Sequence, residues 1–452
     1  MVYGRRRVGK TELIEQTFAD RNLLKFEGLE RQPRESQLRE FARLLASYAN
    51  IPFAESLRFS SWTEALTALA HYVRTGTWTV YLEELQWMAN YETELVSALK
   101  SVWDNEFRRN PNIILVLCGS APSFMVNKVL HSAALYNRTE VDFPVSPFSL
   151  RESKLFMGQD RSEWEVMDAV LTVGAIPPYL EKLKDQSSIF LSLAKHSFVP
   201  PAYFANEYER IFTSSLSSNS HYRKILEYLS EKPFANRGEI AKVIGKEPGG
   251  EFSALLKDLE QMLFIHRYYP PQATFKSRGF RYELSDPFIR FYNRFIFGRR
   301  IEINQGLYSE NPERALSTAE LRPYLGLNFE RWLRQRPALL PKLLGFSGIE
   351  YRCGSYFSRK TPGAQIDMVY DRADKVVTMV EVKYTTDPVG SSIISEFEAK
   401  LKLYPLGKKS LQRILVSAAG GDKSLNSRMY FDKIITLPEL FEVEPRMLSK
   451  SN

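Results

Sequence analysis

The first residues that could carry out chemistry lie almost at the start of the chain, in the segment Gly4-Arg5-Arg6-Arg7-Val8-Gly9-Lys10-Thr11. This spacing of glycines, lysine and hydroxyl residue is that of a Walker A loop, whose backbone N–H groups cradle phosphates. The lysine reaches the β- and γ-phosphates, the hydroxyl binds Mg²⁺, and the following helix directs its amino terminus at the anion. We therefore predict a nucleotide site formed by Gly4, Arg7, Val8, Gly9, Lys10, Thr11 and Glu12.

A pair of carboxylates follows the apolar run Thr77–Leu82. At the end of a strand, one carboxylate can hold the water shell of Mg²⁺ and the next can polarise the attacking water. The sequence thus predicts Glu83 as a metal residue, where aspartate is usual, and Glu84 as the general base. Two solvated glutamates at a strand end are the alternative interpretation.

Two further residues complete the predicted site. Ser120 follows the apolar run Ile114–Cys118 and Gly119, where a polar side chain between the two carboxylates could sense the γ-phosphate. Arg138 is predicted to reach the phosphate and neutralise the charge that develops there, and a surface arginine is the alternative.

The elements that must position these residues are short apolar runs separated by amphipathic stretches. Leu23–Gly28, Thr77–Leu82 and Asn112–Cys118 predict strands, and Glu35–Tyr48 and Thr63–Val73 predict helices between them. This alternation is typical of a parallel sheet covered by helices. From Ser149 to about His196 the pattern becomes wholly helical, which predicts a helical lid.

Between about residues 218 and 297, three helical patterns precede two strand-like runs, which is the order of a winged helix. A DNA-reading third helix needs basic or amide side chains, but Glu251–Leu263 carries one lysine, Lys257, among acidic residues. Phosphate contact by a basic wing and an intramolecular packing role are both open alternatives. The basic residues of the expected wing are His266, Arg267, Lys276, Arg278 and Arg281.

The segment Phe288–Phe295 alternates arginines with aromatic residues. The helical spacing of the aromatics predicts one buried face with the arginines outside. Stacking on a nucleic acid is the alternative.

A second set of chemically capable residues lies in the β-rich carboxyl-terminal region. Strand periodicity places Asp367 on one strand of a hairpin and both Glu381 and Lys383 on one face of the next. Two carboxylates can hold Mg²⁺ while the lysine orients water or stabilises charge during phosphodiester hydrolysis. A cross-strand salt bridge explains Glu381 and Lys383 without chemistry.

Together, GRRRVGKTEL, VYLEELQW, LCGSAPSF, the Arg138 segment and Gly174-Ala175-Ile176-Pro177 resemble the archaeal-type AAA+ ATPases of the STAND (signal-transducing) branch. The resemblance covers nearly the whole chain. It implies ATP and Mg²⁺ as ligands, and a P-loop ATPase followed by a winged helix and a domain similar to PD-(D/E)XK nucleases.

The resemblance also bears on individual residues. It makes Glu330, on a helix before Asp367, an additional metal ligand, and places Tyr404 on a helix that lines the site. Family members carry a strand and helix ahead of the phosphate loop, so we expect a truncated or misassigned start before Gly4. Ala175 also stands where the family has a second glycine.

Composition limits the remaining choices. At 452 residues the chain is long enough for several domains, and no apolar run approaches the roughly 20 residues of a membrane span. We expect a cytosolic protein without membrane contact, and Cys118 and Cys353 lack the spacing of a zinc site or disulfide framework. The formal charge of +8 favours polyanion binding without establishing it.

We therefore predict a multidomain α/β protein with the following parts: a P-loop ATPase core (1–148), a helical lid and linker (149–217), a winged helix (218–303), a linker (304–320) and a restriction-endonuclease-like domain (321–452). The leading hypothesis is an Mg-ATP-dependent switch that controls a nuclease-like domain acting on DNA or RNA. The alternative is a non-enzymatic nucleotide-binding scaffold with an inactive nuclease fold, which associates with itself or with a protein partner.

Overall fold

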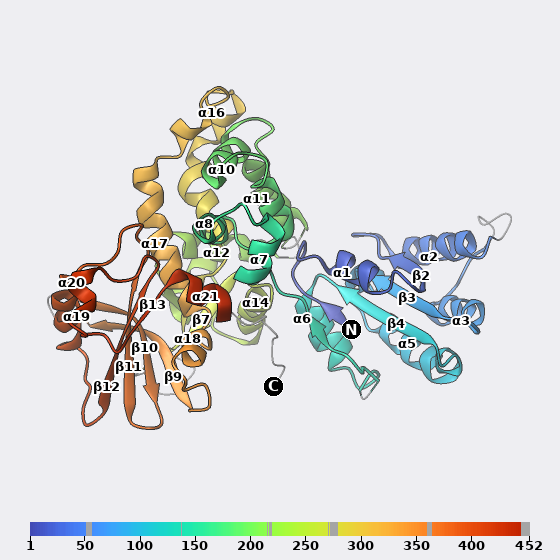
Figure 1. Ribbon diagram of the computed structural model, residues 1–452. Helices are drawn as coiled ribbons and strands as arrows, with labels where there is room; N and C mark the ends of the chain where they lie inside the picture. The colour runs from blue at the N-terminus through green and yellow to red at the C-terminus, as the bar shows by residue number, and fades with distance from the viewer. Residues whose placement is uncertain are drawn as a thin grey trace. The chain divides into compact units, whose positions relative to one another are not determined.

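The structure is a computed structural model that describes residues 1–50, 57–136, 138–214, 216, 219–269, 271, 279–358 and 364–443. It forms two compact units, and the chain passes from unit 1 to unit 2 between Ser146 and Pro147. Figure 1 labels many of their helices and strands. Within these described ranges, no helix is both long and apolar enough to cross a membrane.

Unit 1 is built on a five-stranded parallel sheet in the order β2-β3-β4-β1-β5. The predicted parallel sheet is confirmed, but the sequence pattern missed β1 and β5, because two residues each are too few for a periodicity. The elements of unit 1 are β1 (Val2–Tyr3), α1 (Lys10–Thr17), β2 (Asn22–Glu27), α2 (Arg34–Tyr48), α3 (Trp62–Tyr72), β3 (Trp78–Glu83), α4 (Leu85–Met88), α5 (Glu94–Asn105), β4 (Ile113–Gly119), α6 (Pro122–Phe124) and β5 (Phe143–Pro144).

Both faces of this sheet are buried, which explains the continuous apolar runs of its strands. On one face, Val80 and Leu82 of β3 pack with side chains of α2, α3 and α5. On the other face, Tyr81 packs with Ile14 of α1. Because side chains alternate along a strand, β3 supports helices on both sides and ends at Glu83.

Unit 2 begins with helices and continues with a small antiparallel sheet in the order β6-β8-β7. Three helices precede or flank these strands at the positions that the sequence predicted; their identification as a winged helix stays a prediction. The elements are α7 (Leu150–Met157), α8 (Glu163–Thr172), α9 (Pro177–Lys182), α10 (Ile189–Phe198), α11 (Tyr203–Ser214), α12 (Ser220–Glu231), β6 (Ala235–Asn236), α13 (Arg237–Ile244), α14 (Gly250–Gln261), β7 (Ile265–Tyr268), β8 (Arg281–Leu284), α15 (Pro287–Phe291) and α16 (Arg300–Asn304).

The carboxyl-terminal part of unit 2 contains a mixed sheet in the order β13-β12-β11-β10-β9. β10 pairs antiparallel with both β9 and β11, whereas β12 pairs parallel with both β11 and β13. The elements are α17 (Thr318–Arg334), α18 (Leu339–Leu343), β9 (Tyr351–Ser358), β10 (Ala364–Arg372), β11 (Val376–Lys383), α19 (Ile393–Leu401), β12 (Ser410–Ser417), α20 (Lys423–Asn426), β13 (Lys433–Ile435) and α21 (Leu437–Val443).

One apolar core runs through all of these parts of unit 2. Its buried side chains extend from Leu150 in α7 to Phe441 in α21. Polar contacts join the same parts: the Tyr384 hydroxyl donates to Asp168 Oδ1 at 2.7 Å, and Asn328 Nδ2 donates to the Leu171 carbonyl at 3.1 Å. Helix α8 and the carboxyl-terminal sheet therefore pack together in one apolar core.

The aromatic face predicted in the segment Phe288–Phe295 is confirmed as core, since Phe288, Phe291, Tyr292 and Phe295 are buried. The expectation that its arginines lie outside is wrong for Arg290. This guanidinium is buried and donates to Asn328 Oδ1 at 2.9 Å and to the Ser285 carbonyl at 3.0 Å. A buried arginine is tolerated where such acceptors replace water.

A buried ion pair connects the small sheet to the carboxyl-terminal sheet. Arg334 of α17 contacts Glu283 of β8 at 3.0 Å, and the two side chains are 7% and 1% exposed. Arg334 also donates to the hydroxyl of Ser355, which in turn donates to the backbone carbonyl of Asp367 at 2.7 Å. The strand that carries Asp367 is thus fixed to α17 through a chain of buried hydrogen bonds.

We expect Arg334→Met to lower the free energy of unfolding of unit 2 by about 3–5 kcal/mol, because it leaves the Glu283 carboxylate buried without a partner. Urea denaturation followed by tryptophan fluorescence would measure this loss. Arg322→Met, at an exposed position of the same helix, is the matched control. The double variant Arg334→Met/Glu283→Gln should recover part of the stability, and a loss below about 1 kcal/mol in Arg334→Met would contradict a stabilising role for the pair.

Candidate functional site

The loop after β1 has the backbone geometry that close approach to an anion requires. A Cβ added to Gly4 would lie 2.1 Å from the carbonyl oxygen of Val145, so only glycine fits there. Gly9 has a φ of 91° and caps α1, which begins at Lys10. Arg7, with a φ of 70°, also adopts the left-handed region, and Val8 is buried. The segment between β1 and α1 is therefore a tight loop that ends at a helix amino terminus.

The side chain of Lys10 folds back onto this loop. Its ammonium donates to the carbonyl oxygens of Gly4 and Arg5, at 3.0 Å each. Burial lowers the pKa of Lys10, an effect that Cys118, Glu84 and Glu83 oppose. The loop thus encloses a buried positive charge.

Thr11 and Glu83 meet directly, since the threonine hydroxyl donates to Glu83 Oε1. The other carboxylate oxygen, Oε2, lies 2.8 Å from the ammonium of Lys25 in β2, which is also 3.1 Å from Glu15 Oε1. Burial acts to raise the pKa of Glu83, but hydrogen bonds from Lys25 and Thr11 outweigh it and the net shift is downward. Glu83 is therefore held as a carboxylate against the first turn of α1.

Glu84 lies one residue further on, in a strained backbone conformation (φ 49°, ψ 49°) that non-glycine residues rarely adopt. Its Oε2 accepts from the Ser120 N–H at 3.1 Å, from the Ser120 hydroxyl at 2.5 Å and from Gln86 Nε2 at 2.6 Å. The sequence predicted Ser120 between the two carboxylates, and in the structure its N–H and hydroxyl both donate to Glu84. Strain of this kind persists where the surroundings fix it, as at functional sites.

The strand order explains why these residues meet. β1 and β3 both pair with β4 in a parallel sheet, so their carboxyl ends and the segments that follow them lie at one edge. That edge brings an ammonium, a hydroxyl and two carboxylates to the start of α1. Such a set can bind a phosphate chain and a divalent cation, and can orient a water molecule.

Two predicted residues lie outside this cluster of contacts. Arg138 forms a two-point ion pair with Asp104, at 2.9 and 2.8 Å, in the last turn of α5. Because α5 leads from the end of β3 back to the start of β4, Asp104 lies toward the opposite edge of the sheet, so the predicted reach of Arg138 to the phosphate is not supported. Glu12 is exposed and accepts from Gln16 at 3.0 Å, one turn along α1.

The sequence pattern missed two residues that the structure adds to the site. Lys25 comes from a neighbouring strand, and Gln86 Nε2 contacts both Glu84 Oε2 and the Ser120 hydroxyl, the latter at 3.1 Å. The lysine had no recognisable spacing relative to Glu83, because the two are neighbours only through the pairing of β2 with β3. Gln86 stands next to the acidic pair in the sequence and was the easier of the two to find.

The second predicted cluster lies where β10 and β11 run side by side. Met368 pairs with Val380, so Asp367 and Glu381 occupy neighbouring positions of the two strands. Asp367 is 6% exposed, and its Oδ2 accepts from the Val382 N–H at 2.9 Å. Burial raises the pKa of Asp367 to about 7, and the carboxylates of Glu381 and Glu330 add to the rise.

The carboxylate of Glu381 forms ion pairs with two lysines. Its side chain is 1% exposed, and both of its oxygens accept from Lys400 of α19, at 2.7 and 2.6 Å. Lys383 approaches Glu381 Oε1 at 3.2 Å and Glu396 Oε2 at 3.4 Å. Among the described side chains, no group of three or more His, Cys, Asp or Glu residues is arranged to hold a metal ion. The metal-binding role of Asp367, Glu381 and Glu330 stays a prediction.

The remaining residues of the second cluster have the following places. Glu330, on α17, is 3.5 Å from Gln365 Nε2, and burial raises its pKa, with Glu381 contributing. Tyr404 lies beyond the end of α19 instead of on it, and packs edge-to-face on Tyr356 with ring centres 5.1 Å apart. Of the basic residues predicted for the wing, Lys276 and Arg278 lie outside the described residues.

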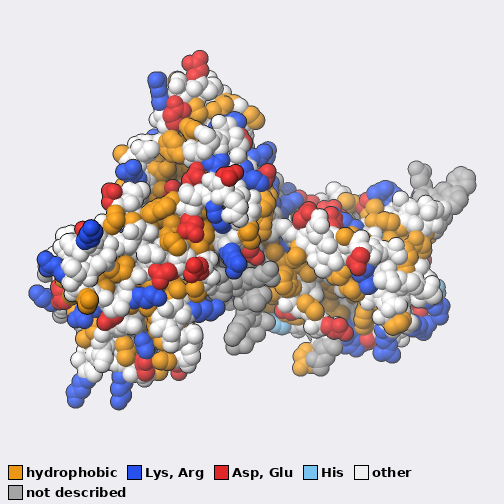
Figure 2. Space-filling view, viewed as in Figure 1, with side chains coloured by type: hydrophobic (Ala, Val, Ile, Leu, Met, Phe, Trp, Pro, Cys, Tyr) orange, Lys and Arg blue, Asp and Glu red, His pale blue; other side chains and the backbone are white. Residues whose placement is uncertain are grey.

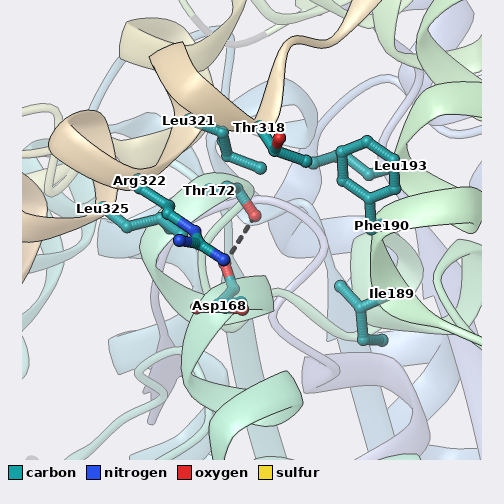
Figure 3. A pocket seen from close by; sticks show the side chains of 9 residues that line it. All are labelled: Asp168, Thr172, Ile189, Phe190, Leu193, Thr318, Leu321, Arg322 and Leu325. Carbon is teal, nitrogen blue, oxygen red and sulfur yellow. Dashed lines mark hydrogen bonds between the residues drawn. The ribbon is translucent and has the colours of Figure 1, made fainter. Parts of the chain in front are cut away.

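A pocket of roughly 200 Å³ lies elsewhere in unit 2, between α8, α10 and α17 (Figure 3). Its wall is mainly apolar, with Asp168, Thr172 and Arg322 as polar members. On the face shown in Figure 2, Lys and Arg side chains are interspersed with Asp and Glu side chains. On this face, the described residues form no continuous basic stripe of the kind that is typical of nucleic-acid binding.

Comparison with known proteins gives the following similarities. Residues 1–183 match a family described as an ATPase domain predominantly from Archaea. An uncharacterized protein of Methanocaldococcus jannaschii, MJECL04, is 25% identical over 390 residues, which cover 85% of this chain and 82% of that protein. The amino-terminal part of the chain is thus similar to ATPase domains of the archaeal type.

Two solved structures also show similarity. The Walker-type ATPase PABY2304 of Pyrococcus abyssi is 20% identical, with a TM-score of 0.45, over 64% of this chain and 89% of that one. The ORC2 protein of Aeropyrum pernix, solved in ADPNP–ADP complexes, is 17% identical, with a TM-score of 0.42, over 70% of this chain and 87% of that one.

The raised pKa of Asp367 predicts a pH-dependent effect on stability. The folded chain keeps a proton on Asp367 up to about pH 7, whereas the unfolded chain releases it near about pH 4, so this carboxyl lowers the stability progressively as the pH rises between these values. We expect Asp367→Asn, which is neutral throughout, to be more stable than the wild type at pH 8 by at least about 1 kcal/mol. The difference should shrink toward about pH 4.

Denaturant unfolding of both proteins at several pH values would test this expectation. Asp387→Asn replaces an exposed aspartate of the same region and serves as the control. A stability difference that does not change with pH would contradict the assignment.

Proposed function

We propose that the chain is an ATP-hydrolysing switch whose nucleotide site lies at the carboxyl edge of the unit 1 sheet. The observation that carries the proposal is the convergence of Lys10, the Thr11–Glu83 pair and the Glu84–Ser120 pair on the loop between β1 and α1. The family match of residues 1–183 supports ATP as the nucleotide.

Each residue of this site has a role that follows from its chemistry. The loop amides and the Lys10 ammonium bind the phosphates, and Lys10 exchanges the Gly4 and Arg5 carbonyls for phosphate oxygens when it does so. Glu84 accepts the proton of the attacking water, since Ser120 and Gln86 hold its carboxylate in place. Ser120 senses the γ-phosphate. Lys25 keeps Glu83 ionised and fixed in orientation.

Mg²⁺ fits the Thr11–Glu83 pair, because a hydroxyl and a carboxylate oxygen are ligands that this ion prefers. Thr11 and Glu83 would hold it, and it would supply neutralisation of phosphate charge. Lys25, on the other oxygen of Glu83, anchors the longer glutamate that stands in the place of the usual aspartate.

The switch is proposed to control how a nuclease-like domain in unit 2 engages nucleic acid. The ATPase match extends to residue 183 and so includes α8, which belongs to unit 2. From α8, Asp168 bonds to Tyr384, the residue after Lys383, and Trp164 packs on the same tyrosine ring at 5.3 Å. A change in α8 on nucleotide binding would therefore act directly on the end of β11.

We expect Lys10→Ala to lower the rate of ATP hydrolysis by about 100-fold or more, because the mutant lacks the charge that holds the phosphates. Glu84→Gln should lower kcat by about 100-fold while leaving nucleotide binding intact, because it removes the proton acceptor only. Phosphate release and fluorescent-nucleotide titration would measure turnover and binding separately.

Lys100→Ala and Glu92→Gln, at exposed positions of unit 1, are the matched controls and should behave as the wild type does. Equal turnover in Lys10→Ala and the wild type would remove the basis for this site. Loss of nucleotide binding in Glu84→Gln would assign Glu84 a role in binding instead of in the proton transfer.

A second candidate function for unit 2 is a nuclease-like domain that recruits a nucleic acid or a protein without cutting. The specific observation in its favour is Lys400, which fills both oxygens of Glu381. Partner binding, including self-association of the chain, would then be the output of the ATP-driven switch. The winged helix predicted for α12–β8 would add a contact surface, with its acidic third helix unsuited to reading bases.

A cleavage assay distinguishes this candidate from an active nuclease. We expect the wild type and Asp367→Ala to give the same background cleavage of single- and double-stranded DNA and RNA with Mg²⁺ or Mn²⁺, with or without ATP. Cleavage by the wild type that Asp367→Ala reduces by about 100-fold or more would instead establish nuclease activity at this cluster.

A further inference from the structure

The carboxylate of Glu381 is surrounded by protein groups that supply the positive charge a divalent metal would otherwise bring. Lys400 Nζ lies 2.7 Å from Oε1 and 2.6 Å from Oε2, so one ammonium bridges both oxygens. Lys383 adds a second ammonium at 3.2 Å from Oε1. A carboxylate that is only 1% exposed needs such compensation to remain charged.

The helix that supplies Lys400 is packed firmly against the sheet. Ile393 and Phe397 of α19 are buried in a core with Ile366 and Val369 of β10. Lys400 follows Phe397 by three residues, and its side chain is 23% exposed, so it reaches from the rim of this core toward Glu381. The packing of α19 therefore sets the position of the ammonium.

Helix α19 also contributes a carboxylate that contacts Lys383. Glu396, one turn before Lys400, lies 3.4 Å from Lys383 Nζ, and its side chain is 55% exposed. Asp367 is likewise engaged, because its Oδ2 accepts from the Val382 N–H. In this arrangement, the groups that a nuclease-like site would turn toward a metal are turned toward one another.

We propose that Lys400 is the built-in counter-cation of Glu381 and that it excludes divalent metal from the Asp367–Glu381 pair. An ammonium that bridges both oxygens competes with a divalent ion for them, since the like charges repel at this distance. Removal of the Lys400 charge should therefore create a metal site of carboxylate oxygens. This inference deepens the second candidate function, on which it rests, and gives the reason that the cluster would not cut.

Mn²⁺ titration of the full-length, nucleotide-free chain, with free Mn²⁺ followed by electron paramagnetic resonance, tests the proposal. The wild type should show no binding that depends on Asp367 or Glu381. Lys400→Gln, which keeps much of the side-chain length without the charge, should bind one Mn²⁺ more per chain than the wild type does. The double variant Lys400→Gln/Asp367→Asn should lose this gain.

Lys402→Gln, at an exposed neighbouring position, is the matched control and should behave as the wild type does. The proposal is overturned if the wild type binds Mn²⁺ at a site that Glu381→Gln abolishes, a measurement that does not require the Lys400 variant to fold. It is also overturned if folded Lys400→Gln, checked by circular dichroism, gains no Mn²⁺. ATP turnover and nucleic-acid cleavage, measured on the same samples, report separately on the proposed functions.

Discussion

A buried carboxylate is stable only where hydrogen-bond donors or cations replace the water it has lost. Among the described residues, Glu83, Glu283 and Glu381 meet that requirement with different partners. Glu83 is held by Thr11 and Lys25, Glu283 by Arg334, and Glu381 by Lys400 and Lys383. The partner chosen in each case determines whether the carboxylate can take part in chemistry.

At Glu83, one oxygen contacts the hydroxyl of Thr11, which is itself suited to bind a metal ion. Lys25, which contacts the other oxygen, comes from the neighbouring strand β2. The oxygen that faces α1 is therefore contacted by the hydroxyl of Thr11. Glu84, beside it, bonds only to neutral donors among its described partners, namely Ser120 and Gln86. The unit 1 cluster is therefore arranged as a site that can accept an anion and a cation.

At Glu381 the situation is reversed, because Lys400 bridges both oxygens. The Glu83–Glu84 cluster and the Asp367–Glu381 cluster both contain residue types that can carry out chemistry. They differ in which groups compensate the charges of their carboxylates. Unit 2 also has a core from α7 to α21 that includes side chains of β10 and β11, so the placement of these strands is linked to that of the helices before them. Helix α19 packs on β10 in a second core. A ligand-driven movement in α8 would reach this cluster through Asp168 and Tyr384.

The sequence by itself determined the features that depend on local spacing. The phosphate loop, the Glu83–Glu84 pair, the strands β2, β3 and β4, and the hairpin of β10 and β11 all follow from glycine positions or from the periodicity of apolar residues. The very short strands β1 and β5 could not be found in this way, since two residues show no period.

Only the tertiary structure decided which groups face one another. Lys25 reaches Glu83 through the pairing of β2 with β3, and Arg138 is drawn to Asp104 by the return path of α5. Lys400 reaches Glu381 because α19 packs on the sheet, although 19 residues separate the two in the chain. Charge pairing depends on distances of a few ångströms between segments that are far apart in sequence. Local patterns in a single sequence do not reveal those distances.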